Sequence, residues 1–225
     1  RRTFLQNNVS RIVRGLLAVS LLGSVGIAAG LSTPELNEPS ATTTNPTAAT
    51  IPAAAPLTFK LDPVHCMALF RIHHVGAGQV WGMFDDVSGT VVYPEDGSAA
   101  PAFDVTVKVE SVHTGTEKLN RTIAGPQFFD AKEFESIRFV STGGTSTGDK
   151  TWDITGDLTM HGVTKPITAK VECTGVAGNP VQKKAGFEAI FAVKRSDFGM
   201  NWGVKNKALG DEVRLVVGLE GDWVR

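Results

Sequence analysis

The adjacent histidines His73 and His74 are the residues whose types best fit metal binding or acid–base chemistry. They fall in a stretch of alternating apolar and polar residues, which is typical of a β-strand. Neighbours on a strand point to opposite faces, so the two imidazoles cannot share one ion. Parity places His74 on the face of Cys66, Phe70 and Ile72, which we interpret as inward. His74 is therefore either a polar contact for a ligand or a histidine with a purely structural role.

A second group with chemical potential is Arg195 and Asp197, which flank Ser196. These side chains could bind a charged group of a ligand. Alternatively, they hydrogen-bond each other and cap the turn that leads to Phe198. Ser196 is a candidate N-cap of a short helical turn.

The two cysteines, Cys66 and Cys173, lie in no Cys-x-x-Cys pair or Cys/His cluster, so a zinc site is not indicated. Both fall on predicted inward faces. They are either two buried free thiols or, in an oxidising compartment, a disulfide. A His-Glu-x-x-His pair, a phosphate-binding glycine loop and a dinucleotide fingerprint are missing from the sequence. We therefore predict no metal, no cofactor and no enzymatic activity.

The charge balance argues against a nucleic-acid partner. The 225 residues carry 22 Lys and Arg against 23 Asp and Glu, a formal net charge of -1. Such a chain has no global positive field to attract a polyanion.

The start of the chain differs from the rest. Four arginines precede any acidic residue, and an uncharged apolar run from Gly15 to Leu31 follows. This order is typical of an export signal, and Arg1-Arg2-Thr3-Phe4-Leu5 is similar to a twin-arginine motif. We predict an export signal over residues 1–31, with cleavage favoured over anchoring, and a periplasmic or secreted protein. The Pro-, Thr- and Ala-rich residues 32–56 predict a disordered linker.

From Leu57 the sequence alternates with period two, which predicts strands with one buried face. Phe103, Val105, Val107 and Val109 alternate with Asp104, Thr106, Lys108 and Glu110. Further strands are predicted over residues 59–74, 84–93, 152–160, 167–173, 187–193 and 213–223. A turn at His161-Gly162 joins two of them, and a short helix is predicted over residues 116–124. Many strands with short reversals predict a β-sandwich or a β-barrel.

Several ordered motifs resemble the YceI-like family, described as polyisoprenoid-binding. They are Asp62-Pro63-Val64-His65, Phe70-Arg71-Ile72-His73-His74, Phe128-Phe129-Asp130, Thr155 to Pro166 with its His161-Gly162, and Arg195-Ser196-Asp197-Phe198-Gly199. The resemblance covers about Phe59 to Gly221. It differs at Leu119-Asn120-Arg121-Thr122-Ile123, where the family usually carries Arg-Asp-x-His-Leu, and at Cys66, where a serine is usual.

The resemblance implies an all-β, antiparallel lipocalin-like barrel of about eight strands with one or two short helices, over residues 57–225. Its channel would take an isoprenoid chain, and a barrel of this size is wide enough for one slender ligand. The predicted polar contacts are His74, Arg195 and Asp197. The predicted apolar channel residues are Phe70, Ile72, Phe84, Val105, Val107, Phe128, Phe129, Phe139, Leu158, Phe187, Phe191, Phe198 and Trp202.

The predicted function is binding of a long isoprenoid lipid, of the polyprenyl phosphate or quinone type, for transport, storage or sequestration in the cell envelope. One alternative is a structural or stress-related envelope protein whose barrel is packed by its own side chains. Another is an enzyme on isoprenoid lipids, with His74, Arg195 or Asp197 as acid–base groups. A homodimer and a membrane or envelope donor or acceptor protein remain open as partners.

Overall fold

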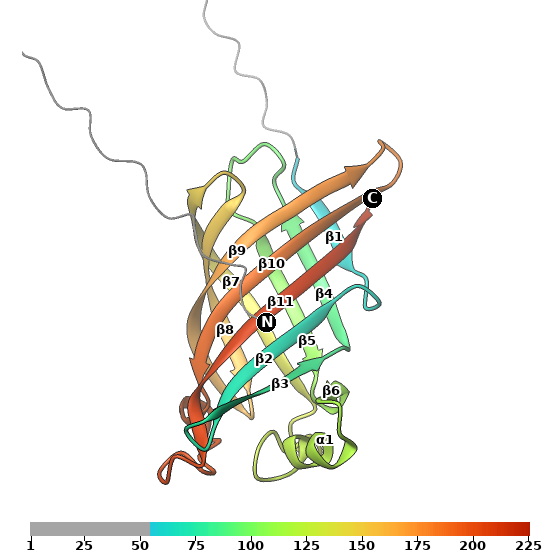
Figure 1. Cartoon of the computed structure of the whole chain (residues 1–225). Helices are drawn as coiled ribbons and strands as arrows, with labels where there is room; N and C mark the ends of the chain where they lie inside the picture. The colour runs from blue at the N-terminus through green and yellow to red at the C-terminus, as the bar shows by residue number, and fades with distance from the viewer. Residues whose placement is uncertain (1–54) are drawn as a thin grey trace, which may run out of the picture. The chain divides into compact units, whose positions relative to one another are not determined.

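The computed structural model of the protein describes residues 55–225, which form an antiparallel β-barrel (Figure 1). The predicted export signal and all but the last two residues of the predicted linker lie outside the described residues. The strands are β1 (Leu57–Leu61), β2 (Met67–His74), β3 (Gly78–Phe84), β4 (Val87–Tyr93), β5 (Ala102–Lys108), β6 (Val112–His113), β7 (Ser136–Gly148), β8 (Thr151–Met160), β9 (Val163–Gly178), β10 (Lys183–Lys194) and β11 (Leu209–Val224).

The barrel closes between its first and last strands. Its order is β1-β4-β5-β7-β8-β9-β10-β11, and β11 pairs back with β1 through Phe59 opposite Trp223. All neighbours are antiparallel. The prediction of an antiparallel, lipocalin-like barrel of about eight strands is confirmed.

Two predicted strands are each broken into two. The predicted strand over residues 59–74 divides into β1 and β2 around Asp62–Cys66, because Pro63 has no amide to donate and the Asp62 carboxylate accepts the Val64 amide at 3.0 Å. The predicted strand over residues 84–93 is wrong at its start: β3 begins at Gly78, and a break at Asp85-Asp86 precedes β4.

After these breaks, β2, β3 and β6 leave the closed ring. β2 continues along β11, β3 pairs with β2, and β6 adds only two residue pairs to β3. On the other side, β7 pairs with β5 only down to Ser136. Among the described residues no ladder joins β6 to β7, so this end of the barrel is less completely paired.

The predicted helix is confirmed as α1 (Glu117–Ala124), which lies beside β6 at this end of the barrel (Figure 1). None of its residues is buried, and the Asn120 side chain anchors it by accepting from the Thr114 amide at 2.8 Å. Within residues 55–225, no helix is both long and apolar enough to pass through a membrane.

Two turns at the same end are tightly built. His161 and Gly162 join β8 to β9 with φ of 51° and 72°, so both adopt the left-handed region that a two-residue hairpin favours. The second predicted helical turn is the 3₁₀ helix η2 (Arg195–Phe198), but Lys194 and not Ser196 occupies its N-cap position. The Ser196 hydroxyl instead donates to Asp211 at 2.8 Å.

Candidate ligand-binding cavity

A cavity of about 470 Å³ runs inside the barrel and is lined by inward side chains of β2, β3, β5, β7, β8, β9, β10 and β11 and by α1. Period-two alternation produces this lining, since every second residue of each strand points inward. Within the cavity, Phe84 contacts both Phe70 and Phe129, with ring centroids 5.6 Å and 5.4 Å apart. The lining is almost wholly apolar, so it can accept an apolar chain and offers little to a polar molecule.

Most of the predicted channel residues lie together on this lining. The structure places twelve of the thirteen there: Phe70, Ile72, Phe84, Val105, Val107, Phe128, Phe129, Phe139, Leu158, Phe187, Phe191 and Trp202. Phe198 is the exception, because η2 turns it into a small core with Met200, Val193 and Leu158. It is 1% exposed and does not reach the cavity.

Sequence reasoning missed other residues of the lining. Among them are Phe103, Val171 and Leu219 at the β1 end, and Leu119, Ile123 and Gln127 at the α1 end. The strand residues follow the same alternation as those predicted, so extending the parity along every strand would have found them. Gln127 lies in the segment after α1 and has no such signal.

Aromatic rings close the end of the cavity that lies toward the start of β1. Phe103 and Phe187 line the cavity, with ring centroids 5.5 Å apart, and Tyr93 packs behind Phe187 at 5.5 Å. Trp152 contacts Tyr93 at 6.2 Å. All four side chains are buried, so this end is a packed aromatic plug.

The opposite end is the mouth of the cavity. Leu119 and Ile123 of α1 face the cavity, and Phe128 contacts Trp202 with ring centroids 5.6 Å apart. Trp202 lines the cavity while 48% exposed, so it lies at the boundary between the cavity and solvent. Here the Leu119 to Ile123 segment carries the uncharged Asn120 and Thr122 where the family usually has an acid and a histidine.

The two adjacent histidines separate as the strand geometry requires. His74 lines the cavity near its mouth, whereas His73 faces outward and its Nδ1 lies 2.8 Å from the Gln79 amide nitrogen. His74 is exposed as well, so it can contact a polar group at the mouth.

Arg195 is 3% exposed and borders the cavity, but its guanidinium is already occupied. It donates to the carbonyl oxygens of Gly210, Met200, Trp202 and Leu209, at 2.7, 2.7, 2.6 and 3.2 Å. Burial lowers the pKa of Arg195, and Asp211 opposes this shift. The structure therefore assigns Arg195 to holding the β10–β11 loop.

Asp197 is exposed and does not line the cavity. Asp211, which the sequence did not single out, caps the turn instead by accepting from the Ser196 amide at 3.0 Å. The predicted hydrogen bond between Arg195 and Asp197 is thus replaced by contacts to backbone carbonyls and to Asp211.

Both cysteines are free and buried. The Cys66 thiol donates to the Glu220 carbonyl at 3.3 Å, and burial raises its pKa. Tyr93 lies beside Cys173, and burial together with this thiol raises the pKa of Tyr93 to about 12. The raised pKa of Cys66 is the opposite of the lowered pKa that a reactive cysteine has.

Gly144, Ser146 and Gly148 have the Gly-x-Ser-x-Gly spacing of a nucleophile elbow, so the expectation that the sequence lacks this motif is wrong. They lie on the exposed last part of β7, and the Ser146 hydroxyl donates to the Gly148 carbonyl at 3.3 Å. An elbow needs a sharp turn from a strand into a helix, and β7 continues as a strand into β8. The spacing carries no nucleophilic site here.

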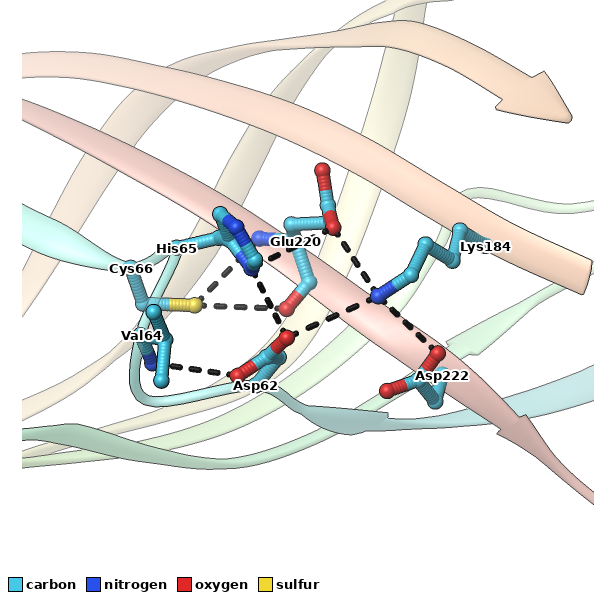
Figure 2. Close-up of polar contacts among 7 residues, drawn as sticks. All are labelled: Asp62, Val64, His65, Cys66, Lys184, Glu220 and Asp222. Atoms are coloured by element: carbon cyan, nitrogen blue, oxygen red, sulfur yellow. Dashed lines mark hydrogen bonds and ion pairs between the residues drawn. The ribbon is translucent and has the colours of Figure 1, made fainter.

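A polar cluster covers the break between β1 and β2 on the outside of the barrel (Figure 2). Nδ1 of His65 lies 2.8 Å from the Asp62 carboxylate, and the Lys184 ammonium lies 3.0 Å from both Glu220 and Asp222. The His65 hydrogen bond is the main cause that lowers the pKa of Asp62, and the two acidic partners raise that of Lys184. The cluster ties the break to β10 and β11.

Three members of this cluster offer atoms that could reach one metal ion. The ligand atoms of Asp62, His65 and Glu220 lie within 4.8 Å of one another. However, the Lys184 ammonium already contacts both carboxylates, at 3.5 Å from Asp62 and 3.0 Å from Glu220. A cation site would have to displace it, so the arrangement is an ion-pair network.

An antiparallel eight-stranded barrel around an apolar cavity defines a lipocalin-like binding protein. The family model of the YceI-like domain matches residues 59–221, and the chain belongs to this family. Protein YceI of Salmonella arizonae is 33% identical over 172 residues, which are 75% of this chain and 88% of the relative.

Solved structures agree with the fold. BcnA of Burkholderia cenocepacia is 25% identical with a TM-score of 0.63, and the match covers 72% of this chain and 99% of BcnA. A polyisoprenoid binding domain of Saccharophagus degradans, implicated in plant cell wall breakdown, matches with a TM-score of 0.56 at 14% identity, over 75% of this chain and 99% of the domain. BcnA consists almost wholly of the matched barrel, and in this chain residues 55–225 lie within one compact unit.

Proposed function

We propose that the barrel holds the chain of one isoprenoid lipid, of the polyprenyl phosphate or quinone type, with the headgroup at the mouth. The observation that carries this proposal is the apolar cavity, which is closed at one end by the aromatic plug and bordered by exposed residues at the other. The two plug rings that line the cavity, Phe103 and Phe187, offer no partner for a buried polar group, so the headgroup is not placed at that end. Only the tail fits inside.

The tail would supply most of the affinity. Each buried methylene contributes about 0.8 kcal/mol, so an isoprene unit contributes roughly 3 to 4 kcal/mol before the cost of ordering the chain. The polar residues near the mouth, His74, Thr122 and Gln127, would contact the headgroup. The Saccharophagus relative, a polyisoprenoid binding domain with the same fold, supports an isoprenoid over other apolar chains.

The proposed role is transport, storage or sequestration of this lipid in the cell envelope, after export through the predicted signal. The proposal includes no catalytic step, and the YceI-like family is a family of binding domains. The alternative of a barrel packed by its own side chains predicts no cavity, and a space of about 470 Å³ does not fit that alternative.

The test is mass spectrometry of lipid extracted from the purified protein, with uptake of a quinone and of a prenyl phosphate measured on the delipidated form. We expect an isoprenoid at up to one molecule per barrel. A protein that carries no lipid and takes up neither probe contradicts the proposal, and a stoichiometric straight-chain fatty acid contradicts the isoprenoid assignment.

A matched pair of variants localises the binding. Ala189 lines the cavity, whereas Ala192 on the same strand is exposed on the outside. Ala189→Phe should fill part of the cavity and reduce uptake at least tenfold, since a bulky ring competes for the space of the chain. Ala192→Phe should leave uptake unchanged. Equal uptake by both variants would place the lipid outside the barrel.

A further inference from the structure

Two loops beside the mouth form one surface, which we call the platform: the β2–β3 turn with its flanks, residues 73–78, and the loop of residues 199–209. The Val75 amide donates to the Ala208 carbonyl at 3.1 Å, and Leu209 pairs with His74. The buried Arg195 fixes the carbonyls of Met200, Trp202 and Leu209 from below. Hydrogen bonds therefore fix the conformation of the platform directly at the entrance of the cavity.

The platform exposes two large apolar side chains. Val75 is 59% exposed and Trp202 is 48% exposed. Val75 also has a φ of 45°, a conformation that strains a β-branched residue and that Gly or Asn adopts more easily. A strained, exposed valine contributes little to folding, which points to a role in binding.

The charge of the platform has one sign. Lys205 and Lys207 are exposed, and neither residues 73–78 nor residues 199–209 contain a carboxylate. The nearest acidic residues along the chain are Asp197 and Asp211, and Asp211 is engaged by Ser196. The opposite side of the mouth differs, since α1 and the segment after it carry Glu117, Lys118, Arg121, Asp130, Lys132 and Glu133.

We propose that the platform docks on the anionic surface of a lipid bilayer, with Val75 and Trp202 entering the interface and Lys205 and Lys207 contacting the headgroups. Tryptophan is favoured at a membrane interface because its ring is both apolar and polar, and each lysine is attracted by anionic lipid. The choice of a bilayer as the partner rests on the proposed function. Docking by the platform would place the mouth of the cavity against the membrane that contains the lipid.

The test uses the barrel domain, residues 55–225, so that the preceding apolar segment cannot bind vesicles by itself. Binding is measured by flotation with vesicles of phosphatidylglycerol and phosphatidylethanolamine that contain no isoprenoid, and with phosphatidylcholine vesicles. We expect binding to the anionic vesicles that weakens as salt is added. Lys205→Gln/Lys207→Gln should weaken it about tenfold, since two cations are lost.

The variant Val75→Asn separates docking from folding. Asparagine adopts a positive φ more easily, so this variant should unfold at an unchanged or higher temperature. Its vesicle binding should nevertheless fall roughly fivefold because the apolar anchor is lost. The controls are Lys60→Gln/Lys170→Gln on the barrel wall and Val181→Ser at the opposite end, all exposed, which should bind like the unchanged domain.

The outcomes distinguish this proposal from the proposed function. Loss of vesicle binding in the platform variants alone supports docking, even if the domain takes up no isoprenoid, in which case the proposed function fails by itself. A domain that takes up isoprenoid but does not bind anionic vesicles overturns docking. Equal binding by platform and control variants overturns it as well, and so does concentration-dependent dimerisation that the platform variants abolish without any vesicle binding.

Discussion

The two ends of the barrel are built differently. At the end toward the start of β1, the ring of strands is closed through β1 and β11, and buried rings of Tyr93, Phe103, Trp152 and Phe187 fill the interior. At the other end, β2, β3 and β6 have left the ring, and α1 covers the gap without burying a single residue.

The difference assigns folding stability to the plug end and access to the cavity to the α1 end. Tightly packed rings contribute much to folding because each buries a large apolar area, whereas a half-exposed helix contributes little. The plug end should therefore unfold last and the α1 end should open first. Substitutions at the two ends can test this contrast.

The largest effect is expected at the plug. Phe187→Ala should reduce the free energy of unfolding by about 3 to 5 kcal/mol, because a fully buried ring contacts Tyr93 and Phe103 and leaves a cavity when removed. Urea unfolding measures this loss. Phe191→Ala, two inward positions further along the same strand and only half-buried, should cost less. An equal loss would mean that the plug is no better packed than the cavity wall.

The second effect concerns the loop at the mouth. Arg195→Met should cost about 2 to 4 kcal/mol, since it leaves several carbonyl oxygens without their buried donor. Arg195→Lys should not restore stability, because one ammonium cannot reproduce the geometry of the guanidinium. Uptake of lipid by the folded protein should persist. Abolished uptake in a folded Arg195→Met variant would instead make the arginine a ligand contact.

At α1 we expect a smaller loss of stability together with a faster release of bound lipid. Leu119→Ala should lower the free energy of unfolding by less than about 1 kcal/mol, since the side chain is only half-buried. Release of a bound isoprenoid into acceptor vesicles should become faster, because less apolar surface holds α1 over the mouth. Stopped-flow transfer measures this rate, and an unchanged rate would show that the lipid leaves by another path.

The smallest effect is expected at the polar cluster that covers the break between β1 and β2. The folded state lowers the pKa of Asp62, so its contribution is full above the ordinary carboxyl pKa near 3.9 and is lost as pH falls through the lower folded-state value. Asp62→Asn should therefore reduce the melting temperature at pH 7, and the reduction should become smaller as the pH falls below the ordinary carboxyl pKa. The exposed Asp85→Asn at the neighbouring break is the control. An Asp62→Asn variant that loses as much at pH 2 would contradict an ionic role.

The alternation of apolar and polar residues predicted the barrel and most of its lining, because a strand with one buried face has apolar residues at every second position. Val105 and Val107 illustrate this: their parity indicated their face, and both line the cavity. The strand breaks were missed although the sequence marks them, because the buried positions change from odd to even numbers across Asp62–Cys66 and from even back to odd numbers across Asp85-Asp86.

Local sequence patterns did not reveal contacts whose partner lies far along the chain or is a backbone atom. Arg195 was predicted to contact a ligand or Asp197, but four carbonyls up to 15 residues away bind it. Phe198 follows the family motif, yet the tight 3₁₀ turn rotates it out of the cavity. Neither contact has a sequence periodicity that could reveal it.

The aromatic plug determines how a lipid can enter and leave the cavity. A container with one opening cannot pass its contents through, so cargo must leave by the route it entered, and tail-first entry leaves the headgroup facing outward throughout. Delivery from one membrane to another would then require the whole molecule to detach, reorient and present the same opening again. The protein would work as a shuttle that turns around, and never as a conduit between two surfaces held at its opposite ends.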